Sequence, residues 1–206
     1  MSGPQITVAR KSGAAAALKR IAGLGKLAAY VGIPSSTSRA RSAHLLGMAD
    51  NVKSKRKKAR LQKAADADVT NAELLFIFSK GSPMRRQPPR PVLEPAVEAD
   101  GNRQVIAREL AGACKASIDG DRAKAVKQTK RAALAGQTAA RKWFTDPRNN
   151  WASLADSTKR GRARRMSKAQ LAAATDDEGS LKNSAFTPGV DTGAMRAAII
   201  GIISEE

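Results

Sequence analysis

Cysteine and histidine are almost absent from this chain of 206 residues, which contains one of each, Cys114 and His44. No disulfide can form within the chain, and no zinc site of ordinary ligand number can be assembled. The spacing of residues in the sequence also suggests no third group that could orient the histidine of a catalytic Cys–His pair. Because Cys114 stands in an alanine-rich helical pattern, we expect it to be a small buried residue.

The motifs of common enzyme classes are missing as well. The chain has no glycine-rich phosphate loop with Lys-Ser or Lys-Thr, no cluster of metal-ligand residues and no Ser/His/Asp set. Its paired carboxylates lie only in polar runs that solvent can reach. We therefore expect a protein that is not an enzyme and that needs no cofactor or metal.

Aromatic residues and long apolar runs are scarce. Aromatics make up 3% of the chain, and alanine supplies much of its 42% hydrophobic content. An alanine side chain buries little apolar area, so we expect a thin, helix-rich subunit that gains stability by assembling with copies of itself. No apolar run reaches about 18 residues, and the first residues lack the apolar core of a signal peptide. We expect a soluble protein made in the cytoplasm, with no membrane partner.

Positive charge is what the chain has in excess, with 37 Lys and Arg against 18 Asp and Glu and a formal net charge of +19. This charge favours nucleic acid or an acidic protein surface as partner, and it is also compatible with basic arms that are simply solvated. Candidate contacts for an anionic partner are Lys53, Lys55, Arg56, Lys57, Lys58, Arg60, Lys63, Arg162, Arg164 and Arg165. Because like charges repel, the first cluster is expected to be a loop, or a helix whose charges a partner neutralises.

Hydrophobic spacing and turn residues predict the elements. Helices are expected over 13–24, from a capping box at Thr70–Glu73 to Gly81, over 95–118 where Gly101 and Asn102 can break it, and over 122–144. The last two are joined by a short turn and should form an antiparallel pair. Strands are expected over 26–31 and 199–203. The second is apolar on both faces, which predicts a central strand or one covered on both faces.

These elements predict an α+β fold with a small mixed or antiparallel sheet flanked by two long antiparallel helices. Residues 1–12 are expected to be a flexible N-terminal arm. Residues 13–206 are expected to form a single domain with long basic loop insertions at 35–68 and 159–185.

Three short segments together resemble a known family, the neck and tail-completion proteins of tailed bacteriophages. The first is an Arg-Pro-x-Leu turn formed by Arg90, Pro91 and Leu93. The second is a Trp-x-x-Leu-x-x-x-Thr segment formed by Trp151, Leu154 and Thr158. The third consists of Asp191, Thr192, Gly193, Met195 and Arg196, with Met195 in place of the family's leucine. Residues 77–81 lack the His-Glu pair that the family has before its proline turn.

The resemblance implies a structural virion protein, made in the host cytoplasm and located at the neck or tail end. It would form a ring with copies of itself, sixfold by family analogy, as a head–tail joining or tail-terminator subunit. Its partners would be head connector or portal-side proteins on one face and tail-tube protein on the other, with DNA in the channel as a further contact. The alternative, based on charge alone, is a small basic nucleic-acid-binding protein. That alternative lacks any zinc finger, basic zipper or aromatic RNA-binding strand.

Overall fold

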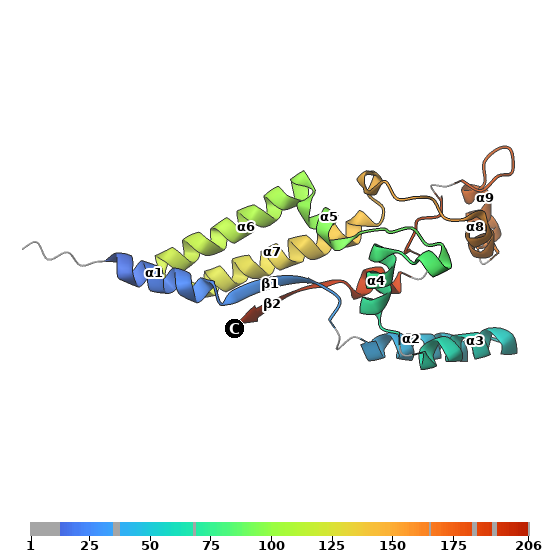
Figure 1. The fold of residues 1–206 in the computed structure, drawn as a ribbon, viewed down its shortest axis with the longest axis horizontal. Helices are drawn as coiled ribbons and strands as arrows, with labels where there is room; N and C mark the ends of the chain where they lie inside the picture. The colour runs from blue at the N-terminus through green and yellow to red at the C-terminus, as the bar shows by residue number, and fades with distance from the viewer. Residues whose placement is uncertain are drawn as a thin grey trace, which may run out of the picture.

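The computed structural model describes residues 13–34, 38–67, 69–164, 166–182, 185–190 and 193–205. Within these ranges the chain is mostly helical and contains one two-stranded antiparallel sheet, which agrees with the broad α+β class (Figure 1). The expected N-terminal arm, residues 1–12, lies outside the described residues.

A long helical hairpin forms the body of the molecule. Helices α6 (Asp100–Asp119) and α7 (Arg122–Trp143) are joined by a turn in which Gly120 has a left-handed φ of 87° and the Asp121 carboxylate accepts a hydrogen bond from the Lys124 amide. Their buried residues are mostly alanines, which let the two helices approach closely. The predicted antiparallel pair is confirmed. The break before α6 falls at Ala99, which has an extended ψ of 127°, two residues before the predicted Gly101.

The sheet lies against α7. Strand β1 (Leu27–Gly32) pairs with β2 (Ile200–Glu205) so that Tyr30 stands opposite Ile202. The amide of Gly201 donates to Gln137 Oε1 at 2.8 Å. Helix α6 packs on α7, so only one of the two long helices covers the sheet (Figure 1). Helix α1 (Gly13–Leu24), at its predicted bounds, packs on α6, with Arg20 Nη1 donating to the Ile118 carbonyl at 3.0 Å.

The prediction that the last strand is central or covered on both faces is wrong. Within the described residues β2 pairs only with β1, and Ile202 is 44% exposed. Its partner Tyr30 is 48% exposed on the same outward face. The isoleucines in residues 199–203 predict an apolar strand. They do not predict how many strands lie beside it, because that number depends on the rest of the chain.

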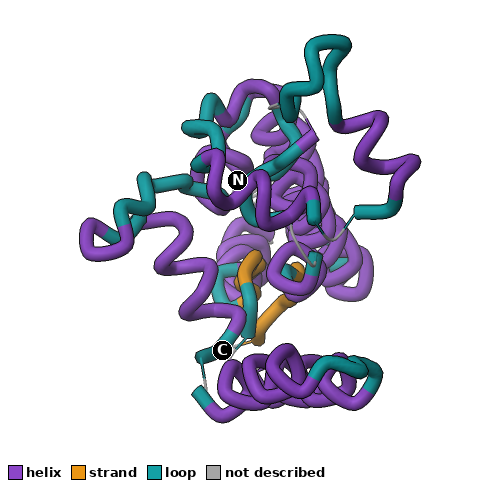
Figure 2. The backbone as a smooth tube through the Cα atoms, turned by 90° about the vertical axis from the view of Figure 1, so that its right-hand side faces the viewer, coloured by secondary structure: helices purple, strands orange, loops and turns teal. Residues whose placement is uncertain are grey.

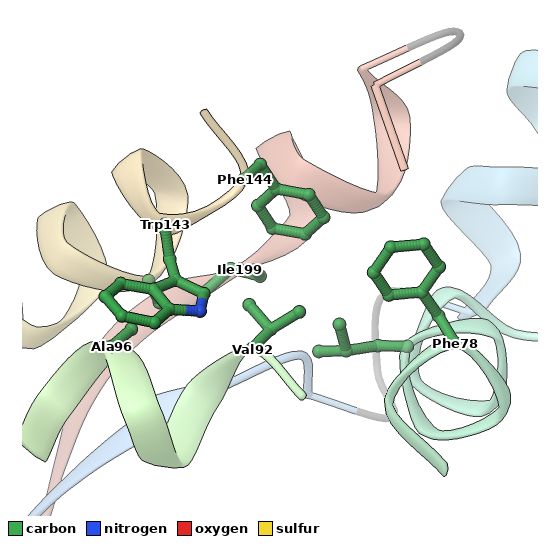
Figure 3. Close-up of a cluster of buried hydrophobic side chains, with 8 residues drawn as sticks. Phe78, Val92, Ala96, Trp143, Phe144 and Ile199 are labelled. Atoms are coloured by element: carbon green, nitrogen blue, oxygen red, sulfur yellow. The ribbon is translucent and has the colours of Figure 1, made fainter. Parts of the chain in front are cut away.

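The opposite end of the body is built from short elements around a core of large side chains. These are α4 (Asn71–Lys80), the 3-10 turn η2 (Pro83–Arg85), α5 (Leu93–Glu98), the 3-10 turn η3 (Pro147–Asn149) and α10 (Ala194–Ala198). The predicted capping box starts α4: Thr70 Oγ1 accepts from the Glu73 amide at 3.0 Å, and Glu73 Oε2 accepts from the Thr70 amide at 2.7 Å. Figure 3 shows side chains from α4, α5, α7 and the β2 segment meeting in this core.

The predicted long basic loops are largely helical. Residues 38–66 form α2 (Ser38–Asp50) and α3 (Lys55–Asp66), which pack on each other and touch the body at α4. In both views the pair lies to one side of the body (Figures 1 and 2). Residues of the second insertion form α8 (Asp156–Ala163) and α9 (Lys168–Ala174). Ala49 on α2 and Ala65 on α3 are buried, and their burial favours the helical pair in spite of the like-charge repulsion on which the loop prediction rested.

Candidate anion-binding and assembly surfaces

The three motif segments of the sequence meet at the aromatic end of the body. Val92 is buried in the core there, and Leu93, Trp151 and Met195 pack against it. The indole of Trp151 meets the ring of Phe78 edge-on at 5.3 Å, measured between ring centroids. These motif residues therefore share one packing role, because they hold distant parts of the chain together.

Phe144 completes this aromatic cluster from the end of α7. It is fully buried, its ring stacks on Phe78 at 6.0 Å and it meets Trp151 edge-on at 5.8 Å. Figure 3 shows Phe144 above the Val92 and Ile199 side chains, with Trp143 beside it. Gly189 packs so closely on Phe144 that a Cβ there would lie 2.8 Å from the ring, and its φ of 77° also requires glycine.

The remaining motif residues are distributed around this core. Leu154 packs against a smaller cluster that contains Ala163 and Phe186. Thr158 is exposed, and its amide donates to the Ala155 carbonyl at 2.9 Å. Gly193, with a φ of 72°, precedes α10, which carries the half-buried Arg196. Asp191 and Thr192 lie outside the described residues.

Arg90 is a buried cation. It is only 4% exposed, and its backbone amide donates to the Phe78 carbonyl at 3.1 Å, which fixes the proline turn against α4. Its Nη2 donates to the Ala152 carbonyl at 3.0 Å, while its buried Nε has no hydrogen-bond partner and it forms no ion pair within the described residues. Burial, and then the positive charge of Arg162, lower the pKa of this guanidinium.

A cleft of about 670 Å³ opens beside Arg90. Its basic lining comes from the η2 segment, from the proline turn and from α8, and among the described residues its one acid is Asp156. Asp156 is neutralised locally, because Lys159 Nζ donates to its carboxylate at 2.9 Å and thereby lowers its pKa. We call this the arginine cleft and define it by Arg85, Arg86, Arg90 and Arg162, with Phe78, Pro88 and Leu154 in its apolar lining.

The first basic cluster lies on α3 and in the turn before it. Lys58 is half-buried and lies 3.5 Å from Asp50, whereas the other members are exposed: Lys53, Lys55, Arg56, Lys57, Arg60 and Lys63. Four cations occupy positions 55–58, the first turn of α3, and the N-cap residue Ser54 makes no capping hydrogen bond. Positive charge is unfavourable at a helix N-terminus, so an anion placed there would stabilise this turn.

The basic residues of α8 and of the positions just after it form a second basic cluster, which has both buried and exposed members. Lys159 is 8% exposed and is held by its ion pair with Asp156. Arg162 Nη1 donates to the Thr187 carbonyl at 2.9 Å and joins the arginine cleft. Arg164 is exposed, and Arg165 lies outside the described residues. Of the predicted contacts for an anionic partner, the structure therefore separates Arg162, in the cleft, from the exposed set on α3.

Sequence reasoning missed Arg85 and Arg86, which η2 presents beside the cleft. The signal that could have found them is the Pro83–Met84–Arg85–Arg86 run just before the proline turn, since proline favours the first position of a tight turn. Met84 at its tip is 99% exposed. The expectation that Cys114 is buried is wrong: its thiol is exposed on α6, because small residues occur on both faces of this helix.

Two absences hold for the part of the chain that the structure describes. No group of three or more His, Cys, Asp or Glu side chains is placed to hold a metal ion. No helix in these ranges combines the length and apolarity needed to cross a membrane. Comparison of the chain with family models, with curated proteins and with solved structures finds no match. The resemblance to phage neck proteins therefore stays a prediction.

Proposed function

We propose that the chain is a structural virion protein of a tailed phage, a ring-forming subunit of the neck or tail end that links the head connector to the tail. The observation that carries self-assembly is the outward face of the β1–β2 sheet. Tyr30 and Ile202 are 48% and 44% exposed there, and Ile200 and Ile33 line the same shallow pocket. A sheet of only two strands is marginal alone and gains stability when a further layer or strand is added.

The edges of the sheet support the same proposal. Within the described residues each six-residue strand pairs on one side only, so the backbone N–H and C=O groups of its other row can pair with another chain, except the Gly201 amide of β2, which donates to Gln137 Oε1. Pairing along such an edge, with apolar side chains added from the neighbour, is a general mode of subunit assembly. The sheet is fixed to the body through α7, so a contact made here would orient the whole subunit.

Helix α3 supports a docking role toward an anionic neck component. Its exposed lysines and arginines lie on a helical pair that touches the body mainly through α4, so they are accessible to a surface beyond the ring. An acidic connector surface and channel DNA both offer the negative charge that these side chains require. The alternative function, free nucleic-acid binding, rests on this same helix.

The first experiment measures assembly. Mass photometry and negative-stain imaging of the purified protein, alone and mixed with disrupted tails, should show rings or subunits bound at tail ends. Ile202→Asp should abolish this assembly, because a charge in an apolar contact is costly when unpaired. The control Leu110→Asp changes a residue of similar exposure, 40%, on α6 and should leave assembly intact. A wild-type protein that stays monomeric and ignores tails would contradict the proposal.

A second experiment separates docking from nucleic-acid binding. Neutralising Lys55, Arg56, Lys57 and Arg60 with glutamine should preserve rings but reduce particle assembly and infectivity. Unchanged infectivity would contradict the docking role of α3. Free nucleic-acid binding instead predicts a steep salt dependence, with a slope near −0.9 in log affinity against log salt for each phosphate contact. The glutamine variant would then lose several units of that slope.

A further inference from the structure

Arg90 makes the arginine cleft an incomplete site. A buried cation is normally paired, because transferring it from water is costly unless an anion and hydrogen bonds replace its hydration. The Nη2 of Arg90 donates to the Ala152 carbonyl, and its Cζ lies 5.8 Å from the centroid of the Phe78 ring. Its Nε has no hydrogen-bond partner, and the side chain forms no ion pair within the described residues. Arg90 is one of the residues that line a cleft open to solvent.

The cleft favours a carboxylate on a protein segment over the phosphates of a nucleic acid. A planar guanidinium binds a carboxylate through two parallel hydrogen bonds, so one acidic side chain matches one arginine. Phe78, Pro88 and Leu154 add apolar surface that suits the aliphatic part of a peptide.

The same chain carries a segment of complementary charge, the acidic turn Asp176–Ser180. Asp176 to Glu178 is the only run of three acidic residues in the sequence. The turn is closed by a bridge between Thr175 and Leu181, and the Ser180 amide donates to the Asp176 carboxylate at 2.7 Å. Asp177 and Glu178 are exposed at its tip, and their side chains make no hydrogen bond or ion pair within the described residues.

We propose that the acidic turn of one subunit inserts its Asp177 and Glu178 carboxylates into the arginine cleft of a second copy. Arg85 and Arg86 at the exposed rim attract the turn, and Arg90 at the base receives a carboxylate. The turn is closed by its own hydrogen bonds before docking, so little conformational entropy is lost. The two surfaces differ, which makes the contact head-to-tail, and head-to-tail contacts that close generate rings.

This inference rests on the proposed function in one respect, because both require the subunit to associate with itself. The test is a charge-swap cycle followed by mass photometry over a concentration series. Arg85→Glu with Arg86→Glu should weaken self-association roughly a hundredfold, since like charges then face each other. Asp177→Arg with Glu178→Arg should do the same, and the quadruple variant should regain most of the loss. All four residues are exposed, so none of the changes removes core packing.

Arg103→Glu with Arg108→Glu is the matched control, because it reverses the same amount of exposed charge on α6, outside the cleft and the acidic turn, and should leave the association constant unchanged. A wild-type protein that never associates overturns both the ring and this contact. A wild-type protein that associates, together with an unaffected Arg85→Glu/Arg86→Glu variant, overturns the contact alone. A quadruple variant as weak as either pair also overturns it. Loss of oligonucleotide binding by the arginine variant, with association intact, would assign the cleft to nucleic acid instead.

Discussion

The two ends of the body are packed by opposite means. At the aromatic end, Phe78, Phe144 and Trp151 fill the space between short elements. At the helix–sheet seam, where α7 lies on the strands, small residues instead let the helix and the strands approach so closely that there is no space to fill. A Cβ on Gly201 would overlap the Ala133 carbonyl, and a Cβ on Gly136 would lie 2.6 Å from Val31 Cγ2. One region is therefore sensitive to loss of volume, and the other to its addition.

The largest expected effect is truncation at the aromatic end. Phe144→Ala should lower the free energy of unfolding by about 3–5 kcal/mol, because it removes the most enclosed ring and leaves a cavity against Phe78 and Trp151. Urea unfolding followed by circular dichroism measures this loss. Phe76→Ala is the control: Phe76 is 64% exposed on α4, so its removal should cost little. Similar losses for the two variants would mean that the ring of Phe144 is not held as the structure shows.

Addition of volume tests the seam. Gly201→Ala should lower the free energy of unfolding by about 1–3 kcal/mol, because β2 must move away from α7 to admit the methyl group. Gly161→Ala provides the contrast, since a Cβ at this position of α8 meets nothing within 4 Å. That variant should be neutral or should gain up to about 1 kcal/mol from helix propensity. A tolerated Gly201→Ala would break the distinction between the two ends.

A smaller effect on stability distinguishes a helix that has a side-chain N-cap from one that has none. Thr70→Ala should cost about 1 kcal/mol, because it removes the cap of α4, the helix that carries Phe78. Ser54→Ala should change stability very little, since Ser54 makes no capping hydrogen bond at the start of α3. Thermal unfolding of both variants measures the difference. Equal losses would show that α3 is capped in solution.

The same contrast explains how far the sequence could predict the fold. The alanine hairpin follows from helical spacing and from Asp121, whose capping role is visible in the local pattern. The start of α4 follows likewise from Thr70 and Glu73, because a capping box is complete within four residues. Signals of this kind depend only on neighbours in the chain, so the sequence predicts the structure that they form.

What could not be predicted depends on contacts between distant residues. The helical state of α3 depends on burial of Ala65 near α2, while the local charge run favoured a loop. The exposure of Ile202 depends on how many strands join the sheet, which no residue of β2 encodes. The arginine cleft is formed by residues 85–90 together with residues 153–162, which are distant in the sequence. The burial of Arg90 without an anionic partner therefore cannot be predicted from its sequence neighbours.

The smallest expected effect concerns pH at the joint between the two regions, just after α7. Arg148 donates to both carboxylate oxygens of Asp146, at 2.9 Å and 2.7 Å, and this hydrogen bonding lowers the pKa of Asp146 below its ordinary value of 3.8. A carboxyl whose pKa is lower in the folded state stabilises the fold above its unfolded pKa, and this contribution is lost as pH falls through the folded pKa. Asp146→Asn should therefore be slightly less stable than wild type at pH 7, and the difference should begin to shrink as the pH falls below about 4. Arg148→Gln removes the other partner, and its difference from wild type should shrink in the same way. Urea midpoints of the three proteins between pH 7 and pH 3 provide the measurement. A deficit that stays constant over this range would mean that Asp146 acts through its turn geometry and not through its charge.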